Sequence, residues 1–246
     1  DQHFYPAKEA LLVPKTSDGR VLFVVPWLGK TLIGTTDTPR TDSPWEPDAL
    51  PEEVDFILKT AGQYLANAPT RADVRSVFVG LRPLVSAGGE KQNTKSISRE
   101  HTVITAPSGL VTITGGKWTT YRSMAEEVVD LVCEQQGWVN KPTRTRYLRL
   151  EDDLPMRKPG SAIHENLDLN EAEIAQAVLE EMAVTIEDVL ARRSRALFLD
   201  SQAALACMNE VRFVLQNELR YSDEELDRQE DEFRGLVAQY SLRAEC

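Results

Sequence analysis

Residues 110–122 constrain the fold of this chain more than any other stretch. Residues 111–114 alternate like a half-buried strand, and apolar residues at helical spacing follow Gly115 and Gly116. The glycine pair therefore stands at a strand-to-helix junction, where glycine allows positive φ and a close approach of the backbone to a ligand. The unpaired N–H groups and the positive dipole end of the helix favour an anion or a carbonyl oxygen there. Lys117 adds a positive charge at the same place.

The spacing alone also fits an ordinary strand-to-helix turn with a surface lysine. The order of residue types in this stretch favours a ligand site. Residues 115–122, Gly-Gly-Lys-Trp-Thr-Thr-Tyr-Arg, closely resemble the C-terminal flavin-contacting segment of the FAD-dependent glycerol-3-phosphate dehydrogenases. Other segments resemble the same family in the same order, namely residues 18–27, 33–38, 80–84, 98–101 and 187–198. The resemblance therefore spans nearly the whole chain.

This resemblance implies an activity, a cofactor and a set of site residues. In the family, sn-glycerol 3-phosphate loses the hydride on its C2 to FAD and becomes dihydroxyacetone phosphate, and the electrons pass to a quinone or to oxygen. A guanidinium suits the phosphate because it can bond two oxygens at once. The resemblance makes Arg82, Arg99 and Lys117 the predicted catalytic residues. The predicted FAD-binding residues are Gly115, Gly116, Lys117, Trp118, Thr119 and Thr120.

Each of these residues also has a plainer interpretation. A single arginine is often a surface ion-pair partner of little energetic worth. Lys117 could be a solvated lysine at a helix start, where the dipole makes a cation mildly unfavourable and a compensating partner is expected. Thr119 and Thr120 could act only as helix caps. His101 is the one histidine near a motif, and we do not make it the general base, which the family resemblance places outside this sequence.

The fingerprint that cradles a dinucleotide pyrophosphate is missing. None of the thirteen glycines forms Gly-x-Gly-x-x-Gly after a strand, whereas the family carries that pattern near its N-terminus. We therefore interpret the chain as the C-terminal part of such an enzyme, inactive or weak by itself. The alternative is a truncated binding or regulatory module that keeps the fold without redox chemistry. Residues 151–163 also look shorter than the family's usual connection.

Composition and charge limit the kinds of partner that the chain could bind. The net charge of −11 argues against general nucleic-acid binding, so an anionic substrate needs a local basic pocket. The three cysteines are widely spaced and show no metal-ligand pattern, so no metal site is predicted. The longest apolar run, residues 21–25, is far shorter than the roughly 20 residues of a membrane helix. We expect a cytoplasmic protein, and leave open a homodimer and peripheral contact with the inner face of the cell membrane.

The pattern along the chain predicts an α+β fold in two domains. Residues 1–144 are predicted to form an antiparallel-sheet substrate domain together with the C-terminal βα piece of an FAD-binding domain. Residues 145–246 are predicted to form a small all-α domain, helical to its end, with N-caps at Asn170, Thr185 and Ser222. The first of its helices is predicted to carry Ile174, Val178 and Met182 on its apolar face. Strands are predicted at 10–13, 21–25, 30–35, 73–80, 102–105 and 110–114, and helices open at Pro51 and near Thr119.

Overall fold

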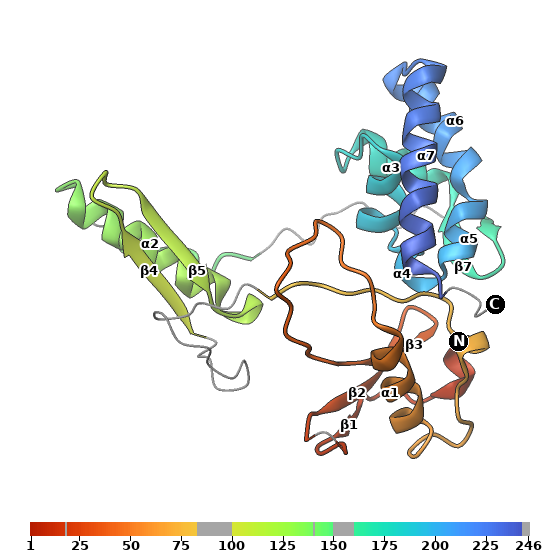
Figure 1. Ribbon diagram of the computed structural model, residues 1–246. Coiled ribbons are helices and arrows are strands. Elements are labelled where there is room, and N and C mark those ends of the chain that lie inside the picture. The colour runs from red at the N-terminus through yellow and green to blue at the C-terminus, as the bar shows by residue number, and fades with distance from the viewer. Residues whose placement is uncertain (18, 83–99, 140, 150–159, 243–246) are drawn as a thin grey trace. The chain divides into compact units, whose positions relative to one another are not determined.

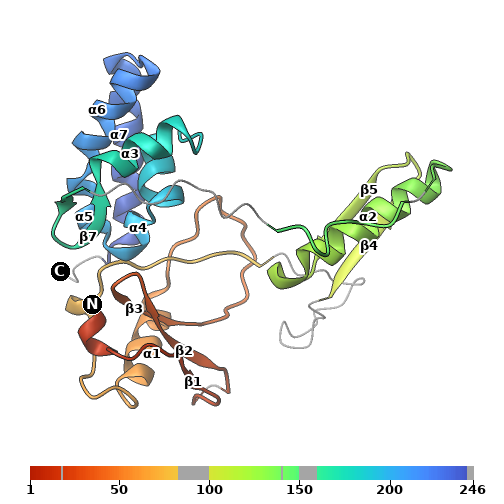
Figure 2. The same cartoon turned by 180° about the vertical axis from the view of Figure 1, so that it is seen from behind.

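The chain forms two compact units, which Figures 1 and 2 show from opposite sides. The computed structural model describes residues 1–17, 19–82, 100–139, 141–149 and 160–242. The first unit joins residues 1–80 to the C-terminal part from 155 onward, and the second is Leu81–Leu154. This grouping differs from the predicted boundary at residue 144. The roles assigned to domains 1–144 and 145–246 stay predictions.

A small antiparallel sheet opens the first unit. Its strands β1 (Leu11–Val13), β2 (Leu22–Trp27) and β3 (Lys30–Gly34) lie in chain order, as the sequence predicts. Leu28 and Gly29 both have positive φ, which suits the tight hairpin turn between β2 and β3. Helix α1 (Pro51–Ala61) contacts β2 and β3 and closes a small apolar core. That core consists of Val13, Leu22, Val24, Ala61 and Leu65.

The rest of the first unit is mostly helical. Helices α4, α5 and α6 contact α7, and α3 contacts α6 (Figure 1). The elements are α3 (Glu171–Leu179), a π-helix η4 (Asp188–Arg193), α4 (Ala196–Leu199), α5 (Ser201–Ala206), α6 (Met208–Leu219) and α7 (Asp223–Tyr240). Their shared core includes the fully buried side chains Ile174, Leu190, Leu197, Leu215 and Phe233. Trp27 of β2 packs against this core, which ties the sheet to the helices.

The three predicted N-caps are confirmed. The Asn170 side-chain oxygen accepts a hydrogen bond from the backbone N–H of Glu173 at 3.0 Å. The hydroxyl of Thr185 accepts from the Asp188 N–H at 2.9 Å. The hydroxyl of Ser222 likewise accepts at 3.2 Å from the N–H of Glu225, in the first turn of α7. Each cap satisfies a backbone donor that a helix start leaves without a helical partner.

Two expectations for the C-terminal part are wrong. The chain is not helical throughout, because a hairpin of β6 (Ala162–His164) and β7 (Leu167–Asn170) precedes α3. In β7, Leu167 and Leu169 are buried on either side of exposed Asp168, which is strand periodicity. Met182, expected on an apolar helix face, is 83 % exposed. Helix α3 has already ended, and Met182 takes a left-handed turn with φ 61°.

The predicted strand at residues 73–80 is also wrong. After a 3₁₀ turn, η2 (Arg71–Asp73), the chain runs extended without joining a sheet in the described structure. Its polar groups bond to helix termini instead. The Val77 N–H donates to the Tyr240 carbonyl at 2.8 Å, and the Ser201 N–H donates to the Arg75 carbonyl at 3.1 Å. The backbone polar groups of this segment thus find their partners at the ends of α5 and α7. Local periodicity does not specify such long-range hydrogen bonds.

The second unit is a hairpin covered by one long helix. Strand β4 (His101–Thr105) pairs antiparallel with β5 (Val111–Gly115), and a turn with Gly109 at φ 86° joins them. A 3₁₀ turn, η3 (Trp118–Thr120), leads into α2 (Tyr121–Gln135), which lies along the hairpin in both views (Figures 1 and 2). The predicted α+β fold, with antiparallel sheet and a helical C-terminal region, is confirmed.

None of the helices in the described residues combines the length and apolar character that crossing a bilayer requires. In the same part of the chain, no group of three or more His, Cys, Asp or Glu side chains could hold a metal ion.

Cys207 makes the stability of the first unit depend on alkaline pH. Its side chain is buried, and desolvation, together with nearby Glu210, raises its thiol pKa from 9.0 to about 11. The unfolded chain ionises this thiol more readily, so its stabilising contribution is full below about pH 9 and is lost towards about pH 11. We expect the free energy of unfolding to fall over this range by about 1–2 kcal/mol more in the wild type than in Cys207→Ala. Urea titrations at several pH values measure this, and parallel pH profiles would contradict it.

Candidate functional site

The junction of β5 and α2 places two glycines where only glycine fits well. Gly115 and Gly116 have φ values of 76° and 82°, as the sequence predicts for this turn. A Cβ on Gly116 would lie 2.6 Å from the Met124 sulfur and 3.1 Å from the Cβ of His101. We call residues 115–120 the glycine turn. Its backbone is held between α2 on one side and β4 on the other.

The helix start after the glycines is open to an acceptor. Lys117 precedes η3 and Thr120 precedes α2, and neither side chain caps a backbone N–H within the described structure. The Thr120 hydroxyl instead donates to the Lys117 carbonyl at 3.0 Å. The N–H groups of Thr120 and Tyr121 donate to the carbonyls of Lys117 and Trp118. The N–H groups of Trp118 and Thr119, which open η3, have no acceptor among the described residues, so they can donate to a ligand oxygen. This arrangement fits the cofactor that the sequence predicts.

The structure describes all six predicted cofactor residues and two of the three predicted catalytic residues, Arg82 and Lys117. All six FAD-binding candidates lie in the glycine turn, and Lys117, Thr119 and Thr120 are exposed. Trp118 is 87 % exposed and stacks on Tyr121, with ring centroids 5.6 Å apart.

The predicted substrate residues are less completely described. Arg82 is exposed and lies two positions after Gly80, where the N-terminal segment of the first unit ends. Arg99 lies outside the described residues. The compensating acidic partner expected for Lys117 is not seen, because no ion pair to Lys117 occurs in the described part of the chain. How Arg82, Arg99 and Lys117 are arranged together stays a prediction.

Sequence reasoning missed a contact beside the glycine turn. His101 faces Gly115 across the β4–β5 pair, and its Nε2 lies 2.6 Å from the Oε2 of Glu127 on α2. The separation in sequence hides this pair, since it depends on the strand register and on the way α2 folds back. A hairpin prediction with its register would have placed His101 opposite Gly115.

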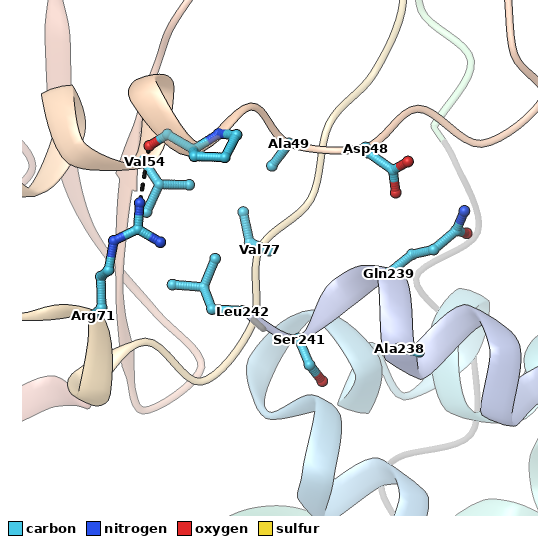
Figure 3. A pocket seen from close by; sticks show the side chains of 10 residues that line it. Asp48, Ala49, Val54, Arg71, Val77, Ala238, Gln239, Ser241 and Leu242 are labelled. Carbon is cyan, nitrogen blue, oxygen red and sulfur yellow. Dashed lines mark hydrogen bonds between the residues drawn. The ribbon is translucent and has the colours of Figure 1, made fainter. Parts of the chain in front are cut away.

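A separate pocket lies within the first unit (Figure 3). Its volume is about 300 Å³, and its walls come from α1, the residues after η2 and the end of α7. Arg71 does not reach freely into it, because its Nη2 donates to the Pro51 carbonyl at 3.1 Å and its Nε to Asp55 at 2.8 Å. The lining residues are Asp48, Ala49, Pro51, Val54, Arg71, Val77, Ala238, Gln239, Ser241 and Leu242. None of the described site residues is among them.

Alanine substitutions can separate the cost of positive φ at Gly116 from the cost of its close packing. Gly116→Ala should destabilise the second unit by about 2 kcal/mol, because it combines left-handed strain with a tight approach to the Cβ of His101 and forces the flexible end of Met124 to move. Gly109→Ala is the matched control, since Gly109 has a similar φ of 86° but no described atom within 4 Å of an added Cβ. It should cost about 1 kcal/mol. Equal losses in denaturant titrations would show that close packing at Gly116 does not matter.

Comparison with known proteins identifies the family. Residues 2–130 match the family described as FAD dependent oxidoreductase, and residues 119–226 match the C-terminal domain of alpha-glycerophosphate oxidase. The chain therefore belongs to the FAD dependent oxidoreductase family. The resemblance to its glycerol-3-phosphate dehydrogenases is confirmed by relatives that match along nearly the whole chain.

Two curated relatives and one solved structure illustrate this. The chain is 34 % identical to the probable mitochondrial glycerol-3-phosphate dehydrogenase of Caenorhabditis elegans, covering 96 % of this chain and 39 % of the relative. It is 34 % identical to the mitochondrial glycerol-3-phosphate dehydrogenase of Mus musculus, covering 93 % and 37 %. The glycerol-3-phosphate dehydrogenase of Bacillus halodurans complexed with FAD matches with a TM-score of 0.75 and 25 % identity, over 100 % of this chain and 57 % of that one. The chain thus spans about two fifths of these curated relatives.

Proposed function

We propose that this chain is the part of a flavin-dependent glycerol-3-phosphate dehydrogenase that binds the substrate and one flank of FAD. The proposed reaction oxidises sn-glycerol 3-phosphate to dihydroxyacetone phosphate. The observation that carries the proposal is the glycine turn, in which a positive-φ glycine pair precedes an uncapped helix start. The resemblance of residues 115–122 to the family's flavin-contacting segment supports the same assignment.

The residues of this chain then have separate roles. FAD, when bound, accepts the hydride from C2 of the substrate. Gly115 and Gly116 let the backbone come close to the cofactor, and the following N–H groups donate to one of its oxygens. Lys117 supplies a positive charge to the substrate phosphate or to the flavin ring. Arg82 and Arg99 bind the phosphate dianion, for which a planar guanidinium is well shaped.

Several parts of the proposal concern partners beyond this chain. The electron acceptor is a quinone or oxygen, and the observations favour neither. A cytoplasmic location, peripheral contact with a membrane and a homodimer all stay predictions. A binding or regulatory module without redox chemistry is the competing function, and it differs from the enzyme in needing no reducible flavin.

The test needs what we call the complete enzyme, which is this chain joined to a segment with the pyrophosphate fingerprint. That segment is taken from the part of the FAD-bound Bacillus halodurans relative that this chain does not cover. The complete enzyme should carry FAD, and glycerol 3-phosphate should bleach its flavin absorbance without oxygen present. Bound flavin that glycerol 3-phosphate fails to bleach would refute the proposed substrate, and a complete protein that takes up no FAD would favour the module.

The chain by itself should behave differently. We expect the 246-residue chain to lose FAD during gel filtration, since it contacts only one flank of the cofactor and lacks the fingerprint that anchors the pyrophosphate. The FAD-to-protein ratio after the column measures this, with the complete enzyme as the control. A stoichiometric flavin absorbance in the chain alone would contradict the expectation.

A further inference from the structure

Two side-chain hydrogen bonds hold α2 on β4. At the middle of the helix, His101 Nε2 lies 2.6 Å from Glu127 Oε2, and at its last residue Gln135 Nε2 donates to Thr105 Oγ1 at 2.8 Å. From Glu127 to Gln135 a helix rises about 12 Å. From His101 to Thr105 a strand rises about 13 Å. The second half of the helix therefore runs alongside β4 with matched spacing, held at its middle by one bond and at its C-terminal end by the other.

Only the first bond lies against the glycine turn. His101 pairs with Gly115 in the sheet register, and its Cβ would come within 3.1 Å of a Cβ on Gly116. Glu127 lies one helical turn beyond Met124, whose sulfur would lie 2.6 Å from the same Cβ on Gly116. The Thr105–Gln135 bond joins the same two elements at the C-terminal end of α2, farther from the glycine turn.

The glycine turn needs such an external restraint. Two successive glycines have more backbone freedom than any other pair, so they do not by themselves fix the direction in which the helix leaves the strand. That direction decides where the first N–H groups of the helix point. A bond from β4 to α2 that spans the turn sets it.

We propose that His101 and Glu127 are positioning residues that fix the orientation of the glycine turn for cofactor binding. This inference rests on the proposed function for its link to FAD. The side chains of His101 and Glu127 are 26 % and 57 % exposed, so the bond adds little to global stability. Its loss should therefore change the order of the turn more than the stability of the unit.

Backbone order parameters from NMR relaxation of the 246-residue chain test the restraint without any cofactor. In Glu127→Ala, which keeps a good helix former, values for residues 115–120 should fall from about 0.85, typical of rigid backbone, towards about 0.6. Glu127→Gln should largely keep them, because its amide oxygen can accept the same hydrogen bond. Thr105→Val is the matched control. It removes the distant bond with an isosteric strand residue and should leave the glycine turn unchanged.

Two results would overturn the restraint. One is an unchanged glycine turn in Glu127→Ala, and the other is an equal loss of order in Thr105→Val. His101→Phe is a second variant, which fills similar space without the hydrogen bond and should reproduce Glu127→Ala. Urea midpoints of all variants should stay close to that of the wild type, which separates lost orientation from unfolding.

The link to the cofactor is measured in the complete enzyme. Glu127→Ala should raise the dissociation constant for FAD about three- to tenfold, whereas Thr105→Val should not. Equal FAD affinity in the wild type and Glu127→Ala would overturn the positioning role even if the NMR result holds. Failure of the wild-type complete enzyme to bind FAD would instead refute the proposed function, so the two failures are distinguishable.

Discussion

Replacing Arg82 with alanine in the complete enzyme should weaken glycerol 3-phosphate binding by about 2 kcal/mol or more, or roughly 30-fold. The physical reason is the loss of the proposed charge-assisted, two-point contact between the Arg82 guanidinium and the phosphate. The affinity of Arg82→Lys for glycerol 3-phosphate should lie between those of the wild type and Arg82→Ala, because lysine keeps the charge without the planar guanidinium. Steady-state KM and kcat/KM for glycerol 3-phosphate measure the effect.

Arg146→Ala is the matched control for this prediction. Arg146 is an exposed arginine of the same unit, and no role in the site is assigned to it. Its removal changes the net charge equally, so it reports any general loss of attraction for an anion. Unchanged kinetic constants in Arg82→Ala, or an equal loss in Arg146→Ala, would refute the assignment of Arg82 to the phosphate.

Phe233→Ala should destabilise the first unit by about 3–5 kcal/mol. Phe233 lies on α7, is 1 % exposed and belongs to the core that the surrounding helices share. Helices α4 and α5 span only 4 and 6 residues, too few to be stable without tertiary packing. A cavity at Phe233 should therefore weaken them all together, as one transition in a urea titration followed by circular dichroism.

Phe213→Ala provides the control for the cavity. Phe213 lies on α6 and is 60 % exposed, so its truncation should change stability by no more than about 0.5 kcal/mol. The same variants also test the division of labour in the chain. In the complete enzyme, Phe233→Ala should reduce stability more than the affinity for glycerol 3-phosphate, and the reverse order would place the helical part in the active site.

Local signals predicted much of this fold. The alternation in residues 10–35 and 102–114 specifies hairpins, and both are observed. Asn170, Thr185 and Ser222 are caps because each begins a helix with an acidic residue three positions later. The glycine pair is equally local, since positive φ at a strand-to-helix turn is a property of the backbone itself.

The features that the sequence did not predict mostly depend on partners that are distant along the chain. The extended segment around Val77 alternates like a strand, yet its partners are helix ends more than a hundred residues away. The His101–Glu127 bond needs the register of β4 against β5 and the direction of α2. The prediction for Met182 is wrong for a different reason. The helical spacing of apolar residues continues in the sequence past Leu179, where α3 ends.

The pairing of Val77 with Tyr240 also orders events during synthesis. A ribosome adding about 5–20 residues per second needs on the order of ten to thirty seconds to travel between these two positions. Throughout that time the backbone around Val77 lacks its native acceptor at Tyr240. The intervening segment, residues 81–154, is complete before then and can fold on its own contacts. The second unit is therefore expected to fold first during synthesis. The segment around Val77 can form its native hydrogen bond only after α7 has been synthesised.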